Sequence, residues 1–225
     1  MKKTIALIAV LLLFVFAAVF SGSARADTIT NYVLSSGNSA LSGYPGPYAN
    51  VLVNLTSDTT AIITFTGLSN PTYQYLIGGA QAADLNVNAS TFAANGFSWT
   101  GGQTSSNPIT AFSPEASPTN NVDGFGKLNL QIDDNDGLKD AVSQLVFTLT
   151  NQSGTWSDSS SVLTPNSLGY YAAAHIYVVD KLDGCNPTTG FAGVKVPEPS
   201  TFLLMGSGLL GLALFGMSAR RKREN

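Results

Sequence analysis

The chain is poor in the residues that most often carry out chemistry in proteins. Its 225 residues include one cysteine, Cys185, and one histidine, His175. A single cysteine excludes an intramolecular disulfide and leaves pairing between chains, a metal contact or an ordinary loop thiol. With so few ligands, a zinc site would need carboxylates to complete it. No G-x-S-x-G sequence is present for a serine hydrolase. We therefore expect no enzymatic activity, and a structural, hydrogen-bonded His175 within a strand.

Positive charge is also scarce between residues 27 and 195, which we call the body. The body has four lysines, no arginine and twelve acidic residues, a net charge of −8. The whole chain has a net charge of only −3, because its cationic residues gather at the two ends. A face that binds nucleic acid needs clustered Lys and Arg. The composition therefore excludes nucleic acid as a partner.

The N-terminus has the pattern of a secretory signal peptide. The first three residues include two lysines, and residues 5–20 are apolar. Small residues follow, with Ala24 and Ala26 in the A-x-A arrangement that precedes a signal-peptidase site. We expect cleavage between Ala26 and Asp27, with an uncleaved N-terminal anchor as the alternative.

The C-terminus has the pattern of a single transmembrane helix. Residues 201–219 contain no charge, and at about 1.5 Å per residue they would form roughly 28 Å of helix, close to the ~30 Å core of a bilayer. Pro197 and Pro199 resist helix formation, so we expect 196–200 to be extended and exposed beside the membrane. A basic cluster that favours the cytoplasm ends the span: Arg220, Arg221, Lys222 and Arg223.

This tail resembles the PEP-CTERM protein-sorting domain of Gram-negative bacteria, which is also catalogued as the ice-binding protein C-terminal domain. The resemblance rests on Val-Pro-Glu-Pro-Ser at 196–200, the Gly/Leu-rich span and the basic end, in that order. It implies recognition by an exosortase-type membrane transpeptidase, and then release or re-anchoring at the cell surface, in association with exopolysaccharide. The sorting motif it implies consists of Val196, Pro197, Glu198 and Pro199. The expected domains are then a signal peptide (1–26), the body (27–195) and a sorting tail (196–225).

Short alternating runs between Gly, Pro and Asn/Asp clusters predict β-strands throughout the body. Residues 49–56 and 61–66 predict the clearest hairpin. Further strands are expected at 28–34, 73–77, 84–88, 97–99, 126–132, 145–149 and 172–180. In 126–132 the odd-numbered residues, including Gln131, are expected to face solvent. A long loop at 103–121 and one helical turn near 136–143 complete the prediction: an all-β fold, an antiparallel β-sandwich of jelly-roll type.

The sharpest local cluster is acidic and comprises Asp133, Asp134 and Asp136. Gly137 follows it, and Ca²⁺ takes six to eight oxygen ligands on a tightly turning backbone. The cluster is not an EF-hand, because Ile132 and Ser143 would occupy its first and twelfth ligand positions. A looser calcium site remains a candidate beside the default of a solvated acidic turn. No other cofactor is expected.

The expected function is that of an exported surface or extracellular-matrix protein with a structural or adhesive role, linked by the resemblance to exopolysaccharide and biofilm. The body stretches 122–126, 147–151 and 172–176 are similar to other PEP-CTERM proteins, which implies a shared fold without an activity. Expected partners are signal peptidase, the transpeptidase, the membrane and exopolysaccharide.

The alternative is a glycan- or ice-binding module that uses Thr/Asn/Ser-rich strand faces. A regular array of outward threonines would support ice binding, and the sequence shows only irregular runs such as Thr60, Thr64 and Thr66. Sugar rings can also stack on aromatic side chains, although these also fill β-sandwich cores. The aromatic candidates are Trp99, Trp156, Tyr44, Tyr48, Tyr170 and Tyr171.

Overall fold

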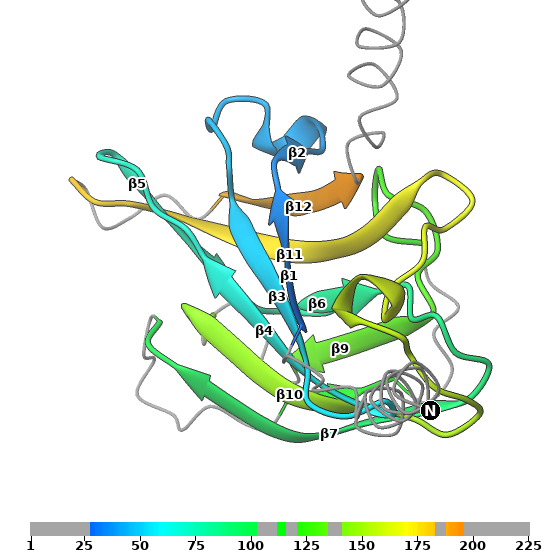
Figure 1. Ribbon diagram of the computed structural model, residues 1–225. Helices are drawn as coiled ribbons and strands as arrows, with labels where there is room; N and C mark the ends of the chain where they lie inside the picture. Colours follow the sequence, from blue (N-terminus) through cyan, green and yellow to red (C-terminus); the bar gives the residue numbers. More distant parts are fainter. Residues whose placement is uncertain (1–27, 103–111, 116–120, 135–140, 183–187, 196–225) are drawn as a thin grey trace, which may run out of the picture.

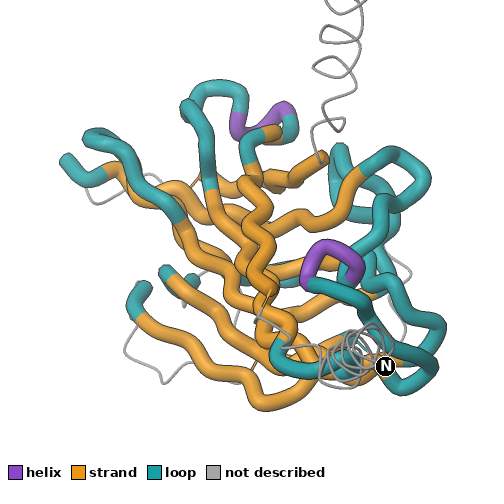
Figure 2. The backbone as a smooth tube through the Cα atoms, viewed as in Figure 1, coloured by secondary structure: helices purple, strands orange, loops and turns teal. Residues whose placement is uncertain are grey.

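The computed structural model describes residues 28–102, 112–115, 121–134, 141–182 and 188–195. Within these ranges the chain is all-β, with two short 3-10 turns, η1 (Ser39–Leu41) and η3 (Ser159–Ser161), between strands and loops (Figure 2). The predicted signal peptide and sorting tail lie outside them. Among the residues described, no helix has the length and apolar character needed to cross a membrane.

Two antiparallel sheets form the fold (Figure 1). Sheet A has five strands in the order β1–β3–β4–β10–β7, and sheet B has seven, in the order β2–β12–β11–β6–β9–β8 with β5 also paired to β11. The bounds in sheet A are β1 (Thr28–Leu34), β3 (Ala49–Leu55), β4 (Thr60–Gly67), β10 (Gln144–Asn151) and β7 (Phe92–Thr100). Those in sheet B are β2 (Ser36–Gly37), β12 (Thr188–Lys195), β11 (Tyr170–Asp180), β6 (Ala83–Leu85), β9 (Leu130–Asp134), β8 (Phe112–Pro114) and β5 (Tyr73–Ile77).

Apolar residues at every second position decide which face of each strand is buried. In the hairpin of β3 and β4, Val53 lies opposite Ile63, and both are fully buried. Strand β10 pairs with the other edge of β4 and places the buried Phe147 opposite the same Ile63. Because side chains alternate along a strand, burying these residues turns the intervening set to the other face of sheet A.

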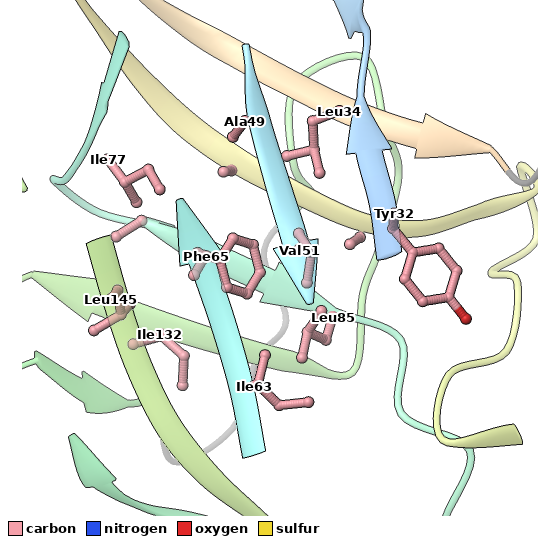
Figure 3. Packing of buried hydrophobic residues seen from close by; sticks show 14 of the residues in the cluster. Tyr32, Leu34, Ala49, Val51, Ile63, Phe65, Ile77, Leu85, Ile132 and Leu145 are labelled. Carbon is pink, nitrogen blue, oxygen red and sulfur yellow. The ribbon is translucent and has the colours of Figure 1, made fainter. Parts of the chain in front are cut away.

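The inward side chains of both sheets form one hydrophobic core. Figure 3 shows Ile63 and Phe65 of sheet A in the same cluster of buried side chains as Leu85 and Ile132 of sheet B. The Phe147 ring stands 6.4 Å from the Phe65 ring and 5.5 Å from the Phe97 ring, centroid to centroid. These aromatic contacts tie three neighbouring strands of sheet A to the same core.

Much of the strand prediction is confirmed. Strands β1 and β5 have the predicted limits, and the hairpin of β3 and β4 differs from its prediction by one residue at most ends. Strands β10 and β11 also form, each slightly longer than predicted. These are the segments in which alternation and turn residues agree.

Other predictions were wrong. Gln131 is fully buried instead of facing solvent. It shares one face of sheet B with Asp84 and Ala173, and Ala173 packs against the cluster of Val122, Phe125 and Leu128. Strand β12 follows the segment that was expected to be the last strand, and β8 lies within the expected loop at 103–121. Strand β7 begins at Phe92, well before the predicted 97–99. The predicted helical turn lies largely in 135–140, outside the described residues, and the chain is not helical at 141–143.

Candidate functional site

Among the described residues, the outer face of sheet A carries no ionisable side chain, and we call it the neutral face. Its residues alternate with the buried ones along β1, β3, β4 and β10, and on β7 they lie opposite the outward residues of β10. They are Ile29, Asn31 and Val33 on β1, Asn50, Leu52 and Asn54 on β3, Thr60, Ile62, Thr64 and Thr66 on β4, Gln144, Val146, Thr148 and Thr150 on β10, and Ala93, Asn95, Ser98 and Thr100 on β7. In a body of net charge −8, a face without charge is a distinct surface.

Threonines from distant parts of the chain lie side by side on the neutral face. Thr60 of β4 lies opposite Thr150 of β10, and Ile62 lies opposite Thr148. The Gln144 side-chain amide donates to the Thr66 hydroxyl at 3.3 Å. The sequence shows only the run on β4, because pairing with β10 joins segments about 80 residues apart, which no local pattern reveals. Sequence reasoning therefore missed the β10 half of this array.

The neutral face also exposes apolar side chains. Ile29 is 59% exposed, and Val33 and Ile62 are each 38% exposed. Among the described residues, they make up three of the five strongly exposed large apolar side chains, the others being Leu168 and Leu182. Apolar groups gathered on one face, rimmed by hydroxyls and amides, are typical of an interaction surface.

A groove of about 490 Å³ runs beside β1 at the margin of the neutral face. It is lined by Thr30, Asn31, Tyr32, Val33, Ser35, Ser160, Tyr171, Val194 and Lys195. The Tyr32 and Tyr171 rings stack with centroids 5.7 Å apart. Figure 3 shows Tyr32 at the margin of the core cluster with its hydroxyl pointing away from the other labelled residues. Sequence reasoning named Tyr171 and missed Tyr32, which is 5% exposed.

Burial raises the pKa of the Tyr32 phenol to about 12, with smaller contributions from Tyr171 and Asp158. Its hydroxyl is therefore a neutral hydrogen-bonding group at any physiological pH. Lys195, the one cation in the groove lining, has its ammonium 4.6 Å from the Tyr170 ring centroid. The groove thus offers aromatic surface, hydroxyls, an amide group and one positive charge.

The other aromatic candidates have structural contacts. Trp156 is 2% exposed and its indole N–H donates to the Asn88 carbonyl at 2.9 Å. Tyr48 is buried, and its hydroxyl donates to the Tyr44 carbonyl at 2.7 Å. Three more candidates pack on neighbouring rings: Trp99 on Phe112, Tyr44 on Tyr73, and Tyr170 on Phe125.

Asp84 is a fully buried carboxyl group on β6. It lies opposite Ala173 of β11 and opposite Gln131 of β9. Among the described residues, neither carboxyl oxygen of Asp84 meets a hydrogen-bond donor. Burial raises its pKa well above the ordinary value, and the neighbouring Asp133 and Glu115 raise it further. Sequence reasoning missed this group, although its neighbours Ala82, Ala83 and Leu85 are apolar.

The predicted calcium cluster is divided between buried and half-buried positions. Asp133 accepts a hydrogen bond from the Gln81 amide at 2.8 Å, and Asp134 accepts one from the Gly79 amide at 3.4 Å. Asp134 is 4% exposed, so the prediction of a solvated acidic turn is wrong there. No three His, Cys, Asp or Glu side chains come together as a metal site in the part of the chain that is described. Asp136 lies outside that part, and the calcium site stays a prediction.

His175 lies on β11, as the sequence predicts. Its Nδ1 is 3.0 Å from the Ala80 carbonyl oxygen, and its ring stacks on Phe191 with centroids 4.3 Å apart. Burial lowers the pKa of the imidazole, and the hydrogen bond to Ala80 opposes this shift. These are the surroundings of a structural histidine.

The remaining predicted site residues lie outside the described ranges. They are Cys185, the signal-cleavage residues Ala24, Ala26 and Asp27, the sorting motif Val196, Pro197, Glu198 and Pro199, and the basic cluster Arg220, Arg221, Lys222 and Arg223.

Comparison with known proteins gave no match: no family model, no curated protein and no solved structure is similar to this chain. Among the described residues, the neutral face and the adjoining groove are the surfaces best suited to binding.

Proposed function

We propose that this chain is an exported protein whose body, a jelly-roll-like sandwich, has a structural or adhesive role at the cell surface or in the extracellular matrix. The signal peptide carries it across the inner membrane of a Gram-negative bacterium, and the C-terminal span anchors it until an exosortase-type enzyme recognises Pro197, Glu198 and Pro199. The neutral face is the observation that supports the adhesive role.

An acidic body repels other acidic proteins and anionic polymers, since like charges raise the free energy of close approach. The neutral face removes this penalty along one side of the sandwich, because no charged group has to be desolvated on contact. Its exposed Ile29 and Ile62 contribute apolar burial of roughly 25 cal/mol per Å², and the threonines and asparagines contribute hydrogen bonds. This combination suits an uncharged, hydroxyl-rich surface such as a neutral exopolysaccharide.

A second candidate function is that of a glycan- or ice-binding module. The threonines of β4 and β10 favour it, because antiparallel pairing sets neighbouring strands about 4.8 Å apart and spaces outward residues at about 6.8 Å along each strand. Thr60, Thr64 and Thr66 thereby join Thr148 and Thr150 in a two-strand array. No enzymatic activity is proposed.

Two positive charges on the neutral face are expected to abolish adhesion. In the variant Ile29→Lys/Ile62→Lys, each lysine must lose hydration on contact and the apolar burial disappears. We expect retention of the protein in the washed extracellular matrix of its own host to fall at least tenfold. The matched control is Leu168→Lys/Leu182→Lys, which places the same charges at two exposed leucines off this face.

Equal retention of both double variants and the wild type would show that the neutral face is not the contact. Glycan arrays and thermal-hysteresis measurements on the same proteins test the second candidate, because adhesion to the matrix requires no recognition of a defined glycan or of ice. Binding or hysteresis that disappears only in the neutral-face variant would establish the second candidate, and blank results in both assays would remove it.

A further inference from the structure

Most strand edges in the described part of the chain are short, interrupted or hydrogen-bonded. At the ends of sheet B, β2 has two residues and β8 has three, the last of which is Pro114. The outer edge of β5 is hydrogen-bonded, because Ile77 and Val142 exchange backbone bonds of 2.8 and 2.7 Å. The register of β7 with β10 shifts in mid-strand, where Gly96 has a φ of +66°. Natural sheets use such features to prevent pairing between edges.

Strand β1 is different from these edges. It has seven residues, Thr28–Leu34, without a charged residue, a proline or a glycine. Its register with β3 is unbroken along its whole length. It ends sheet A and pairs with β3 alone among the described strands (Figure 1). A long, regular and uncharged edge is a template for another strand.

The hydrogen bonds of the neighbouring strands show which β1 residues face the free edge. The Leu68 amide donates to the Tyr48 carbonyl at 2.9 Å, in register with the pairing of β3 and β4. The Thr56 amide donates to the Thr60 carbonyl, also at 2.9 Å and in the same register. Even-numbered residues of β3 therefore bond to β4, and odd-numbered ones bond to the even-numbered residues of β1. The β1 residues whose backbone groups face the free edge are Ile29, Asn31 and Val33.

The groove already described lies against this edge and shows that it is accessible. Residues from Thr30 to Val33 line one side of its volume of about 490 Å³, and Tyr171 and Val194 of sheet B are among those that line the rest. No described element is therefore packed against the backbone of β1 at this edge.

The three outward residues of β1 are complementary to themselves. A second copy of β1 can run antiparallel to the first, with Asn31 opposite Asn31 on a two-fold axis. Ile29 of each copy then lies opposite Val33 of the other, and every outward amide of the two strands meets a carbonyl. No other two-fold register pairs all three residues at once. An interface between identical copies needs such a self-complementary arrangement.

The side chains of these residues also favour a second copy as the occupant. All three belong to the neutral face, where Ile29 is 59% exposed and Val33 is 38% exposed. Pairing places each Ile29 directly beside a Val33 and joins the two Asn31 amides at the axis, and such cross-strand pairs stabilise sheets. Two bodies of net charge −8 repel each other, so copies can meet most easily where no charge is opposed.

We propose that two copies of this chain pair antiparallel along β1, with Asn31 on the two-fold axis. Sheet A then continues through both copies as one sheet of ten strands, five from each. The two neutral faces join into a single surface of twice the length. This pairing goes beyond the adhesive role and does not depend on it, because it is a property of the folded body.

Single cysteines test the register in the full chain, purified in detergent with Cys185→Ser as background. In Asn31→Cys the two thiols lie on the axis, about 5.5 Å apart at Cα and within the roughly 4.4–6.8 Å span of disulfides. Two copies of Ile29→Cys, or of Val33→Cys, place their thiols about 14 Å apart along the strand. We expect a disulfide-linked dimer from Asn31→Cys after mild oxidation, with yields at least tenfold lower from Ile29→Cys or Val33→Cys alone. A mixture of these last two is expected to cross-link again.

Equal yields from all three single cysteines would indicate random collision and overturn the proposal. A monomeric Asn31→Cys after oxidation would also overturn it.

The concentration dependence of mass in sedimentation experiments gives a measurement without added cysteines. Asn31→Pro removes the outward amide and leaves the hydrogen bonds between β1 and β3 intact, because proline is tolerated where its missing N–H faces away from the sheet. We expect its dimer dissociation constant to be at least tenfold higher than that of Asn31→Thr, which keeps the amide. Equal constants, or a wild-type chain that stays monomeric, would contradict the pairing. Neither experiment contains matrix, so their failure would leave the adhesive role untouched.

Discussion

Replacing Phe147 by alanine is expected to lower the free energy of unfolding of the body by about 3–5 kcal/mol. The side chain is fully buried, and its ring lies between those of Phe65 and Phe97 on the two flanking strands of sheet A. Truncation removes the apolar burial and leaves a cavity that β10 cannot close, because it is hydrogen-bonded to β4 on one edge and to β7 on the other. The loss of two ring contacts adds to this cost.

Denaturant unfolding of residues 27–195 measures the change, with Val146→Ala as the matched control. Val146 is the preceding residue on β10 and points to the neutral face. Its truncation is expected to cost less than about 1 kcal/mol, as for most surface substitutions. Equal losses in the two variants would mean that β10 does not present Phe147 to the core.

Replacing Asp84 by asparagine is expected to stabilise the body at neutral pH and to change it little near pH 4. Burial holds the pKa of the folded-state carboxyl well above its ordinary value, with Asp133 and Glu115 adding to the shift. Above about pH 4 the unfolded state loses this proton while the folded state keeps it, so stability falls as pH rises. The fall is at most about 1.4 kcal/mol per pH unit for one proton and stops once the pH passes the raised pKa.

The measured quantity is the difference in unfolding free energy between Asp84→Asn and the wild type, from pH 4 to pH 8. This difference is expected to grow with pH and to favour the variant. Asp58→Asn is the control, because Asp58 is exposed in the turn between β3 and β4. A difference independent of pH, or one that shrinks as pH rises, would show that Asp84 is ionised in the folded protein.

The sequence predicts the fold where a local pattern has a single physical meaning. Alternating Val, Ile and Phe from Val51 to Phe65 give both the hairpin and its buried face, because a side-chain period of two fits only a half-buried strand. Prediction from the sequence fails where burial depends on partners elsewhere in the chain. Gln131 alternates with apolar residues like a surface residue, yet it is fully buried on a face of sheet B where Ala173 packs against Val122, Phe125 and Leu128.

The candidate surfaces were predictable only in part. Thr60, Thr64 and Thr66 were visible as a run, but their neighbours Thr148 and Thr150 arrive by a pairing that no local pattern specifies. Tyr32 is the second example, since it reaches Tyr171 across the two sheets. The predicted sorting motif is the opposite case, because that prediction rests only on the order of residue types along the chain.

Intact-mass analysis of the mature protein from its own host tests the account most directly, with Glu198 intact and with Glu198→Ala. An exported and sorted protein is expected to begin at Asp27 and to end near residues 197–199, and the substitution is expected to leave the tail in place. A wild-type chain that still ends at Asn225 would contradict sorting, and one that still begins at Met1 would contradict cleavage of the signal peptide.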